Sequence, residues 1–237
     1  MTIHLRFVRQ QHEAENATSF FFQPGTSLQF RAGQYLRYTL PHSDPDNRGV
    51  TRNFSIASPP EEPLIRLTTR LSTPGSSFKQ ALRRLQPGAI VESSGPFGDF
   101  VYADLDLTPV FITGGIGITP VLSILGDLAR RKSRVSATLL YSNTTQDIPF
   151  RADIDGLSAH WPEFHVVYTL TRPGPRWEGP TGRITGALIR ELVDDLHGAV
   201  FFVSGPTLMV DAMRAILADS GVDANRVKHE AFPGYDR

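Results

Sequence analysis

The first 105 residues arrange their apolar positions in short runs separated by turn residues. These runs are rich in β-branched and aromatic residues, which predicts strands. Six strands are expected, at residues 3–8, 18–22, 35–40, 54–57, 64–71 and 90–92. One helix interrupts them, because apolar side chains recur at helical spacing from Phe78 to Leu85 and stop at Pro87. This half of the chain predicts a small six-stranded antiparallel β-barrel.

The hydrophobic pattern changes after residue 105. Continuous apolar or β-branched runs predict strands at residues 110–112, 135–141, 164–170 and 200–203. Helical patterns alternate with them, at residues 120–131, 150–159, 185–196 and 206–219. Such alternation predicts a doubly wound α/β fold, whose parallel sheet binds ligands at the carboxyl ends of its strands. We therefore expect two domains, residues 1–105 and 106–237, joined by a hinge at residues 104–109.

Composition narrows the classes of function. The 237 residues include 24 basic and 24 acidic side chains, and this balance argues against nucleic acid or anionic lipid as a partner. The absence of cysteine excludes a disulfide framework, a cysteine-ligated iron-sulfur cluster and a thiol nucleophile within these residues. The scattered histidines lack the spacing of metal ligands, so no metal is expected. No apolar run is long enough for a transmembrane segment and the first residues do not resemble a signal peptide, so we expect a cytoplasmic location.

One cluster of candidate binding residues lies in the first half, where Arg52, Phe54 and Ser55 follow one another on an extended run. A guanidinium can bind a pyrophosphate through two hydrogen bonds, and an aromatic ring can stack on a flat heterocycle. A glycine followed by hydroxyls at a helix N-terminus also suits an anion, and these residues are Gly75, Ser76 and Ser77. The cluster is typical of a flavin dinucleotide site. The alternative interpretation is a barrel strand that carries a surface arginine.

A second cluster lies in two strand-turn-helix segments of the other half. The first contains Gly114, Gly115, Gly117, Thr119 and Pro120. Glycines let the backbone approach a pyrophosphate closely, and proline fits the first turn of a helix. The second segment repeats this logic with Ser204, Gly205, Pro206 and Met209. Together they predict a dinucleotide site, although many α/β crossovers contain a similar glycine turn for structural reasons alone.

The Arg-x-Phe-Ser run at residues 52–55 resembles the Arg-x-Tyr/Phe-Ser motif of the ferredoxin-NADP reductase family, and the turn at residues 114–120 resembles that family's nicotinamide-dinucleotide loop. The resemblance spans nearly the whole chain. It implies that Arg52 binds the FAD phosphates, Phe54 covers one flavin face and Ser55 hydrogen-bonds near flavin N5. It also implies that residues 75–77 bind the pyrophosphate from the opposite side. The short segment at residues 73–77 favours FAD over FMN, and Phe100 is implied as a secondary flavin contact.

Residues 203–209 resemble the family's Cys-Gly-Pro-x-x-Met segment, whose first residue lies over nicotinamide C4. Ser204 stands in the place of that cysteine, which implies a contact at the reacting centre. Ser142 and Asn143 lie where the family recognises the adenosine end. Thr144 stands where members that prefer NADPH carry an arginine. Because Arg172, Arg176 or Arg183 can substitute for it, NADH and NADPH remain open.

The end of the chain, residues 230–235, resembles the family's closing segment, in which an acidic residue and an aromatic approach the flavin and the nicotinamide. Glu230 and Phe232 are the implied residues. A solvated tail is the alternative interpretation.

The resemblance implies an FAD-dependent NAD(P)H oxidoreductase, in which hydride passes from nicotinamide C4 to flavin N5 and electrons then leave to an acceptor. Ser55, Ser204 and Glu230 are the candidate catalytic residues. The expected partner is a separate acceptor, most often a small redox protein such as a ferredoxin, a flavodoxin or an oxygenase component, with a quinone-like small molecule as the alternative. Two other hypotheses are a flavin reductase that releases reduced flavin and a non-catalytic regulatory subunit that binds flavin or nucleotide. The oligomeric state has no signal in the sequence.

Overall fold

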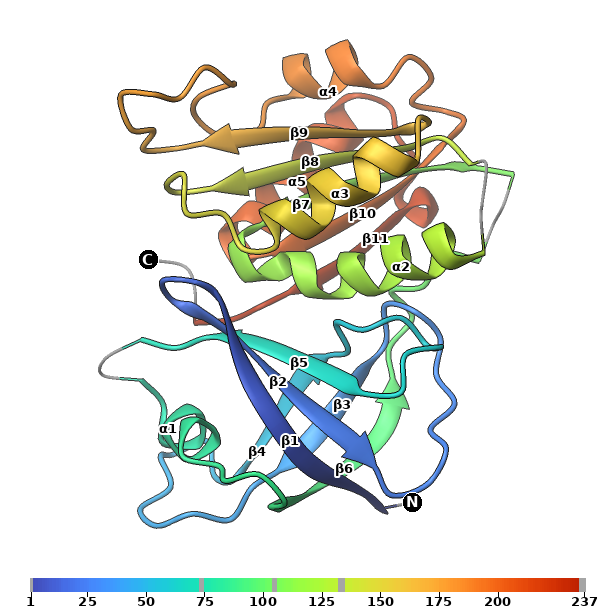
Figure 1. Ribbon diagram of the computed structural model, residues 1–237. Helices are drawn as coiled ribbons and strands as arrows, with labels where there is room; N and C mark the ends of the chain where they lie inside the picture. Colours follow the sequence, from blue (N-terminus) through green and yellow to red (C-terminus); the bar gives the residue numbers. More distant parts are fainter. Residues whose placement is uncertain (1, 73–74, 104–105, 132–134, 235–237) are drawn as a thin grey trace.

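A computed structural model of the protein describes residues 2–72, 75–103, 106–131 and 135–234. Within them the chain forms an antiparallel sheet followed by a parallel sheet, and Figure 1 shows the parallel sheet lying above the antiparallel one. The predicted hinge begins at Asp104 and Leu105, which lie outside the described residues. The domain boundary at residue 105 therefore stays a prediction.

The antiparallel sheet has six strands, in the order β4-β3-β6-β1-β2-β5. They are β1 Thr2–Ala14, β2 Ala17–Pro24, β3 Tyr35–Thr39, β4 Thr51–Ser55, β5 Ile65–Arg70 and β6 Ile90–Phe97. A single bridge between Ile56 and Leu67 joins the two edge strands, so the sheet curves almost to closure. Helix α1 (Ser77–Arg83) packs Phe78 and Leu82 into the aromatic core of this sheet. The predicted six-stranded antiparallel barrel is confirmed as a half-barrel.

The second sheet has five parallel strands, in the order β11-β10-β7-β8-β9. They are β7 Thr108–Gly114, β8 Ala137–Asn143, β9 Phe164–Leu170, β10 Ala199–Gly205 and β11 Val227–Ala231. The helices are α2 Ile118–Arg130, α3 Arg151–His160, α4 Gly186–Leu192 and α5 Thr207–Asp219, with 3-10 turns at Gly115–Gly117 and Ala224–Arg226. This arrangement confirms the predicted α/β fold.

Side chains alternate between the two faces of the parallel sheet. Phe111 and Phe202 pack with α2 and α3, whereas Val110 and Phe201 pack with α4 and α5. The helices that follow β7 and β10 therefore leave the sheet toward opposite faces, although these two strands are neighbours. In a doubly wound sheet this is the switch point, where a crevice opens at the carboxyl ends of the strands.

Several elements differ from the predicted ones, and two strands are longer than expected, since β1 continues to Ala14 and β6 to Phe97. The strand β11 was not predicted, because its five residues are mostly polar and its conformation depends on pairing with β10. The strand β4 begins at Thr51, three residues earlier than expected, because its pairing with β3 includes polar residues as well as the apolar ones. The helix expected at residues 185–196 ends at Leu192, and Val193 already has an extended backbone.

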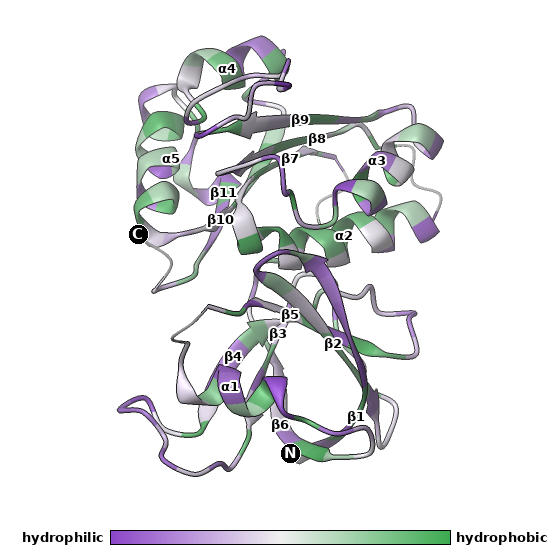
Figure 2. Ribbon diagram, turned by 60° about the vertical axis from the view of Figure 1, so that its left-hand side comes forward, coloured by the Kyte–Doolittle hydropathy of each residue, from purple (hydrophilic) through white to green (hydrophobic). Residues whose placement is uncertain are grey.

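Helix α2 lies between the two sheets. Ten of its 13 residues are buried, which is unusual for a helix on the surface and typical of one covered on several sides. Figure 2 shows this largely apolar helix between the parallel sheet and the half-barrel. Polar contacts cross the same junction, because Ser123 Oγ donates to the Ser58 carbonyl oxygen at 2.8 Å and Arg130 pairs with Glu62 at 2.9 Å. The two sheets are therefore held together over the length of α2.

Candidate functional site

The residues expected to hold a flavin lie at one edge of the half-barrel. Phe54 is partly buried, and the centre of its ring is 5.8 Å from those of Tyr38 and Phe78. Arg52 precedes it on the same strand, and its guanidinium lies 5.5 Å from the centre of the Phe78 ring. Ser55 ends the strand and is buried. The strand thus presents a cation, an aromatic ring and a hydroxyl in sequence.

Arg52 is held by its own loop. Its Nη1 donates to the carbonyl oxygens of Arg48, Gly49 and Thr51, and its Nη2 lies 2.6 Å from Asp46 Oδ1. The Nε atom is buried without a hydrogen-bond partner among the described residues. Burial raises the pKa of Asp46, but hydrogen bonds from Arg48 and Arg52 and their charges outweigh it and lower that pKa to about 2. Asp46 is therefore ionised at neutral pH.

The segment expected to bind pyrophosphate opposite Arg52 has partners of its own. Ser76 Oγ caps α1 by accepting from the Lys79 N–H, and the Ser77 N–H donates to Asp46 Oδ2 at 3.3 Å. Gly75 lies so close to the Ser72 carbonyl that a Cβ would approach its oxygen to 2.6 Å. Thr73 and Pro74, which belong to the same motif, lie outside the described residues.

Ser55 and Glu230 connect the two halves of the molecule. Ser55 Oγ donates to Glu230 Oε1 across 3.5 Å, so the end of β4 lies against the carboxyl end of β11. Glu230 Oε2 is buried and has no partner among the described residues. Burial raises the pKa of Glu230 to about 7, the Ser55 hydrogen bond opposes the increase, and the charge of Asp99 adds to it. The pair thus places a group that titrates near neutrality between the two predicted sites.

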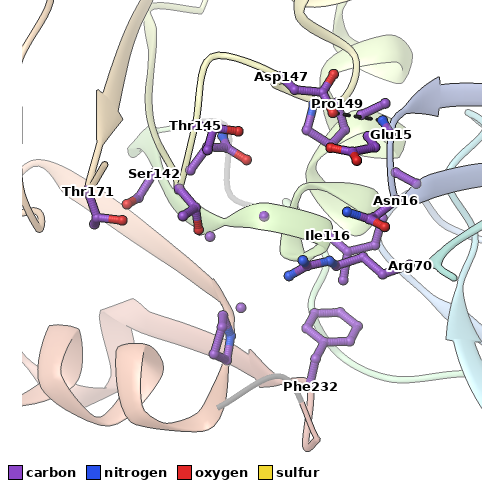
Figure 3. A pocket seen from close by; sticks show the side chains of 18 of the residues that line it. Glu15, Asn16, Arg70, Ile116, Ser142, Thr145, Asp147, Pro149, Thr171 and Phe232 are labelled. Carbon is purple, nitrogen blue, oxygen red and sulfur yellow. Dashed lines mark hydrogen bonds between the residues drawn. The ribbon is translucent and has the colours of Figure 1, made fainter. Parts of the chain in front are cut away.

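A cavity opens at the carboxyl ends of β7, β8 and β10 (Figure 3). Most of the residues expected to bind a dinucleotide line it, namely Gly114, Gly115, Ser142, Asn143, Gly205, Pro206, Met209 and Phe232. Gly115 has a φ of +52° and a Cβ there would meet nothing, so its backbone is open to a ligand. Asn143 Nδ2 is buried without a partner among the described residues and is available as a donor.

Three of the expected dinucleotide residues lie beside the cavity and do not line it. Thr119 Oγ1 donates to the Ile116 carbonyl oxygen, and Pro120 is buried in the first turn of α2. Gly117 touches β10 so closely that a Cβ would meet the Ser204 carbonyl oxygen at 2.5 Å. These residues shape the turn, and the cavity is lined by their neighbours.

The structure places Ser204 near the carboxyl end of β10, next to Gly205, which lines the cavity. Its side chain is fully buried, does not line the cavity, and donates from Oγ to the Gly117 carbonyl oxygen at 2.7 Å. The close approach of the glycine turn brings this carbonyl within reach of a short hydroxyl. The Ser204 hydroxyl therefore connects the two glycine-containing segments, and its expected contact with nicotinamide C4 stays a prediction.

Phe100, the secondary candidate for a flavin contact, is a core residue in this structure. It is 4 % exposed and packs edge-on against Phe202, with ring centres 5.2 Å apart, in the core shared with α2. Its expected contact with the flavin stays a prediction.

The cavity also contains residues that the motifs did not indicate. Arg70, Asn16 and Glu15 reach it from the half-barrel, and Asp147 lies in the loop after β8. Figure 3 shows the Arg70 guanidinium directed into the cavity above Phe232. The Glu15 N–H donates to Asp147 Oδ2 at 2.7 Å and closes one side. The sequence contains no signal for them, because Arg70 is one charged residue near the end of a predicted strand and the other three lie between predicted elements.

The unpartnered donors fit the two groups that the resemblance implies. Arg52 Nε, next to an aromatic ring, suits the phosphate and ring of a flavin dinucleotide. Asn143 Nδ2, the open Gly115 backbone and the Arg70 cation suit a second, nicotinamide-bearing dinucleotide.

Comparison with solved structures supports the fold. The cytochrome P450 reductase of Amycolatopsis superposes with a TM-score of 0.86 at 23 % identity, covering 99 % of this chain and 71 % of that one. A ferredoxin NADP+ reductase from Neisseria gonorrhoeae, solved with FAD and NADP bound, gives a TM-score of 0.82 at 20 % identity and covers 99 % of each chain. Among the described helices none is long and apolar enough to cross a bilayer.

The relatives found by sequence are longer chains. One component of the Na(+)-translocating NADH-quinone reductase of Neisseria gonorrhoeae is 30 % identical over 253 residues, covering 89 % of this chain and 62 % of that protein. The reductase component 1 of terephthalate 1,2-dioxygenase from Comamonas sp is 32 % identical over 213 residues, covering 88 % and 61 %. The chain thus spans about three fifths of the length of these relatives.

Two family models match the chain in succession. The oxidoreductase FAD-binding domain matches residues 4–102, and the oxidoreductase NAD-binding domain matches residues 111–215. With one domain of each kind in this order, on the fold described above, the chain belongs to the ferredoxin-NADP reductase family.

Proposed function

We propose that this chain uses NADH or NADPH to reduce a bound FAD and delivers the electrons to a separate acceptor. The observation that carries this proposal is the contact between Ser55 and Glu230, because it joins the flavin strand of the half-barrel to the carboxyl edge of the dinucleotide sheet. Two ring systems bound on either side of such a contact would be held near each other, which favours a reaction between them.

On the flavin side, Arg52 Nε would donate to a phosphate and Phe54 would cover part of the ring. The FAD itself supplies the chemistry, since it accepts a hydride and releases electrons singly. The protein contributes binding and orientation. Because Ser55 ends β4 in a buried position, its hydroxyl has a fixed direction, and its hydrogen bond to Glu230 Oε1 depends on both sheets keeping their positions.

On the dinucleotide side, the open backbone at Gly115 and the Arg70 cation would receive the pyrophosphate. Asn143 Nδ2 would donate to a ligand at the end of β8. Thr144 is uncharged, and the two acidic residues of this side, Glu15 and Asp147, would repel a 2′-phosphate. The uncharged Thr144 and the two nearby carboxylates therefore support NADH as the better coenzyme.

Glu230 would hold an exchangeable proton. A carboxyl group whose pKa is about 7 is populated in both protonation states at neutral pH. Its Oε2 atom has no partner among the described residues, so a proton there is not committed to another protein group. Glu230 with Ser55 is therefore suited to take up or release a proton beside the reacting rings.

The acceptor lies outside these residues, because they contain no cysteine to ligate an iron-sulfur cluster. The relatives include the reductase component of a dioxygenase and a component of an NADH-quinone reductase. An oxygenase component or a small redox protein is thus the class of acceptor that we propose.

An anaerobic titration of the FAD-loaded protein tests the proposal. NADH should bleach the visible flavin absorbance stoichiometrically, and the flavin should stay with the protein on gel filtration after reduction. Loss of reduced flavin from the protein would indicate the flavin reductase alternative. A flavin that binds but is bleached by neither NADH nor NADPH would refute the reductase and favour a regulatory subunit.

A further inference from the structure

A carboxylate of the protein lies among the groups expected to bind the FAD phosphates. Asp46 Oδ1 is 2.6 Å from Arg52 Nη2, and Oδ2 accepts from the Ser77 N–H at 3.3 Å. Oδ1 also accepts from the Arg48 N–H at 3.0 Å. Asp46 thus contacts both Arg52 and the 75–77 segment, the two sides between which the pyrophosphate was expected.

The donors of Arg52 are almost fully used in this arrangement. Three backbone carbonyls accept from Nη1, Asp46 accepts from one of the two N–H groups of Nη2, and Nε is buried without a partner among the described residues. A planar guanidinium binds a phosphate best when two neighbouring N–H groups donate together. Nη2 belongs to both edges that offer such a pair, one with Nε and one with Nη1, so Asp46 occupies part of the atom that either edge requires.

Charge acts in the same direction. The pyrophosphate of FAD is negatively charged, and so is the Asp46 carboxylate. The two groups would therefore repel each other over distances of several ångströms. Arg48 pairs with Asp46 at 3.6 Å, but its side chain is largely exposed and is screened by water. Asp46 therefore reduces the net positive charge that a phosphate would meet at Arg52.

We infer that Asp46 is an internal competitor of the FAD phosphates, and that full binding of FAD requires the carboxylate to release Arg52 and the Ser77 N–H. The inference rests on the proposed position of FAD at Arg52. The wild-type affinity for FAD is then lower than the barrel permits, and the flavin exchanges more readily than it would without Asp46. Asp46 thereby sets the flavin content of the protein at a given FAD concentration.

A different role for Asp46 predicts the opposite result. If the carboxylate serves to orient Arg52 so that Nε meets a phosphate, its removal would disorder the guanidinium and weaken FAD binding. The sign of the change therefore distinguishes competition from orientation.

The experiment is a titration of flavin-free protein with FAD, followed by flavin fluorescence, for wild type and Asp46→Asn. Asparagine keeps an oxygen acceptor for the Arg48 N–H and removes the charge. Competition predicts that the dissociation constant for FAD falls about tenfold, as expected when one charge-assisted hydrogen bond becomes available to the ligand. An unchanged or larger dissociation constant overturns the inference.

Two controls separate the phosphate effect from general effects. Asp44→Asn makes the same chemical change two residues away in the same loop, where the side chain is exposed and forms no ion pair in the described part of the chain, and it should leave FAD affinity unchanged. Riboflavin has the same ring system as FAD and no phosphate, so Asp46→Asn should not tighten it. Equal tightening of riboflavin, or of FAD by Asp44→Asn, contradicts a competition for phosphate.

A variant that folds poorly does not weaken the test. Thermal unfolding without flavin reports whether Asp46→Asn keeps the fold, and Asp46→Ser provides a second uncharged side chain, for which the same tightening is expected. Because the readout is flavin affinity, it is independent of turnover. A protein that binds FAD as expected but is not reduced by NADH would refute the proposed function and leave the role of Asp46 standing.

Discussion

Ser204→Ala tests whether the Ser204 hydroxyl stabilises the fold through its hydrogen bond to Gly117 or contacts the coenzyme. The side chain is fully buried and donates to the Gly117 carbonyl oxygen at 2.7 Å, whereas the family resemblance predicts a contact with nicotinamide C4. Alanine removes the donor and leaves a buried carbonyl without it, which costs about 1–3 kcal/mol. In a protein of this size each kcal/mol lowers the melting temperature by about 2–4 °C.

The matched control is Ser123→Ala. Ser123 is also fully buried and donates to a backbone carbonyl, that of Ser58 at 2.8 Å, but it lies outside the two segments expected to bind the dinucleotide. Both variants should lose similar stability in urea unfolding and in thermal unfolding. In stopped-flow measurements at saturating NADH, both should reduce the flavin within about twofold of the wild-type rate.

One result would refute this reasoning. If Ser204→Ala is as stable as the wild type but reduces its flavin many-fold more slowly, the hydroxyl faces the coenzyme as the resemblance predicts. Ser204→Cys then gives the complementary measurement, since a thiol is a weak donor to Gly117 but matches the residue of the family at the reacting centre.

Three further predictions concern the flavin, the proton and the coenzyme. Arg52→Ala should weaken FAD binding by about tenfold to a hundredfold in a fluorescence titration while the protein stays folded, and unchanged FAD retention would contradict the assignment of Arg52. Folding raises the pKa of Glu230 from 4.5 to about 7, so the unfolding free energy of the wild type should fall as the pH rises from about 5 to about 8. Glu230→Gln should lack that fall, and a parallel pH profile in both proteins would show that Glu230 titrates normally. The wild type should use NADH at least as well as NADPH, and Thr144→Arg should move the ratio of kcat/KM values toward NADPH; a strong wild-type preference for NADPH would mean that another cation binds its phosphate.

The fold was largely predictable because its signals are local. Apolar alternation gave the barrel strands, and the change of period after residue 105 gave the α/β half. The β9 strand was predicted at residues 164–170, with the bounds that the structure has, since it consists almost entirely of apolar and β-branched residues. In contrast, β11 owes its conformation to hydrogen bonds with β10, a partner more than twenty residues away, and its own five residues carry little strand signal.

The candidate site was predictable only where its residues form a motif. Glycine turns can be recognised in the sequence, because two backbone segments that approach closely leave no room for a Cβ, as at Gly117. The Asp46 carboxylate, the Arg70 cation and the Glu15 amide have no such constraint in the sequence, and their importance comes from what the fold places next to them. Ser204 lies in a motif, and the motif predicts a position at the reacting centre. The motif does not predict the hydrogen bond of Ser204 to Gly117, because that bond depends on which acceptor the fold places nearest.

The cavity is shared between both halves of the molecule, and this affects how such proteins can be recombined. Glu15, Asn16 and Arg70 of the half-barrel form one wall, while the glycine turns of the parallel sheet form the other. A chimera that kept residues 106–237 and received the barrel of a relative would carry every glycine turn unchanged but would have foreign side chains facing the coenzyme. If the coenzyme binds in this cavity as proposed, its preference depends on both halves of the molecule, and exchange of the barrel is expected to change the KM for NADH.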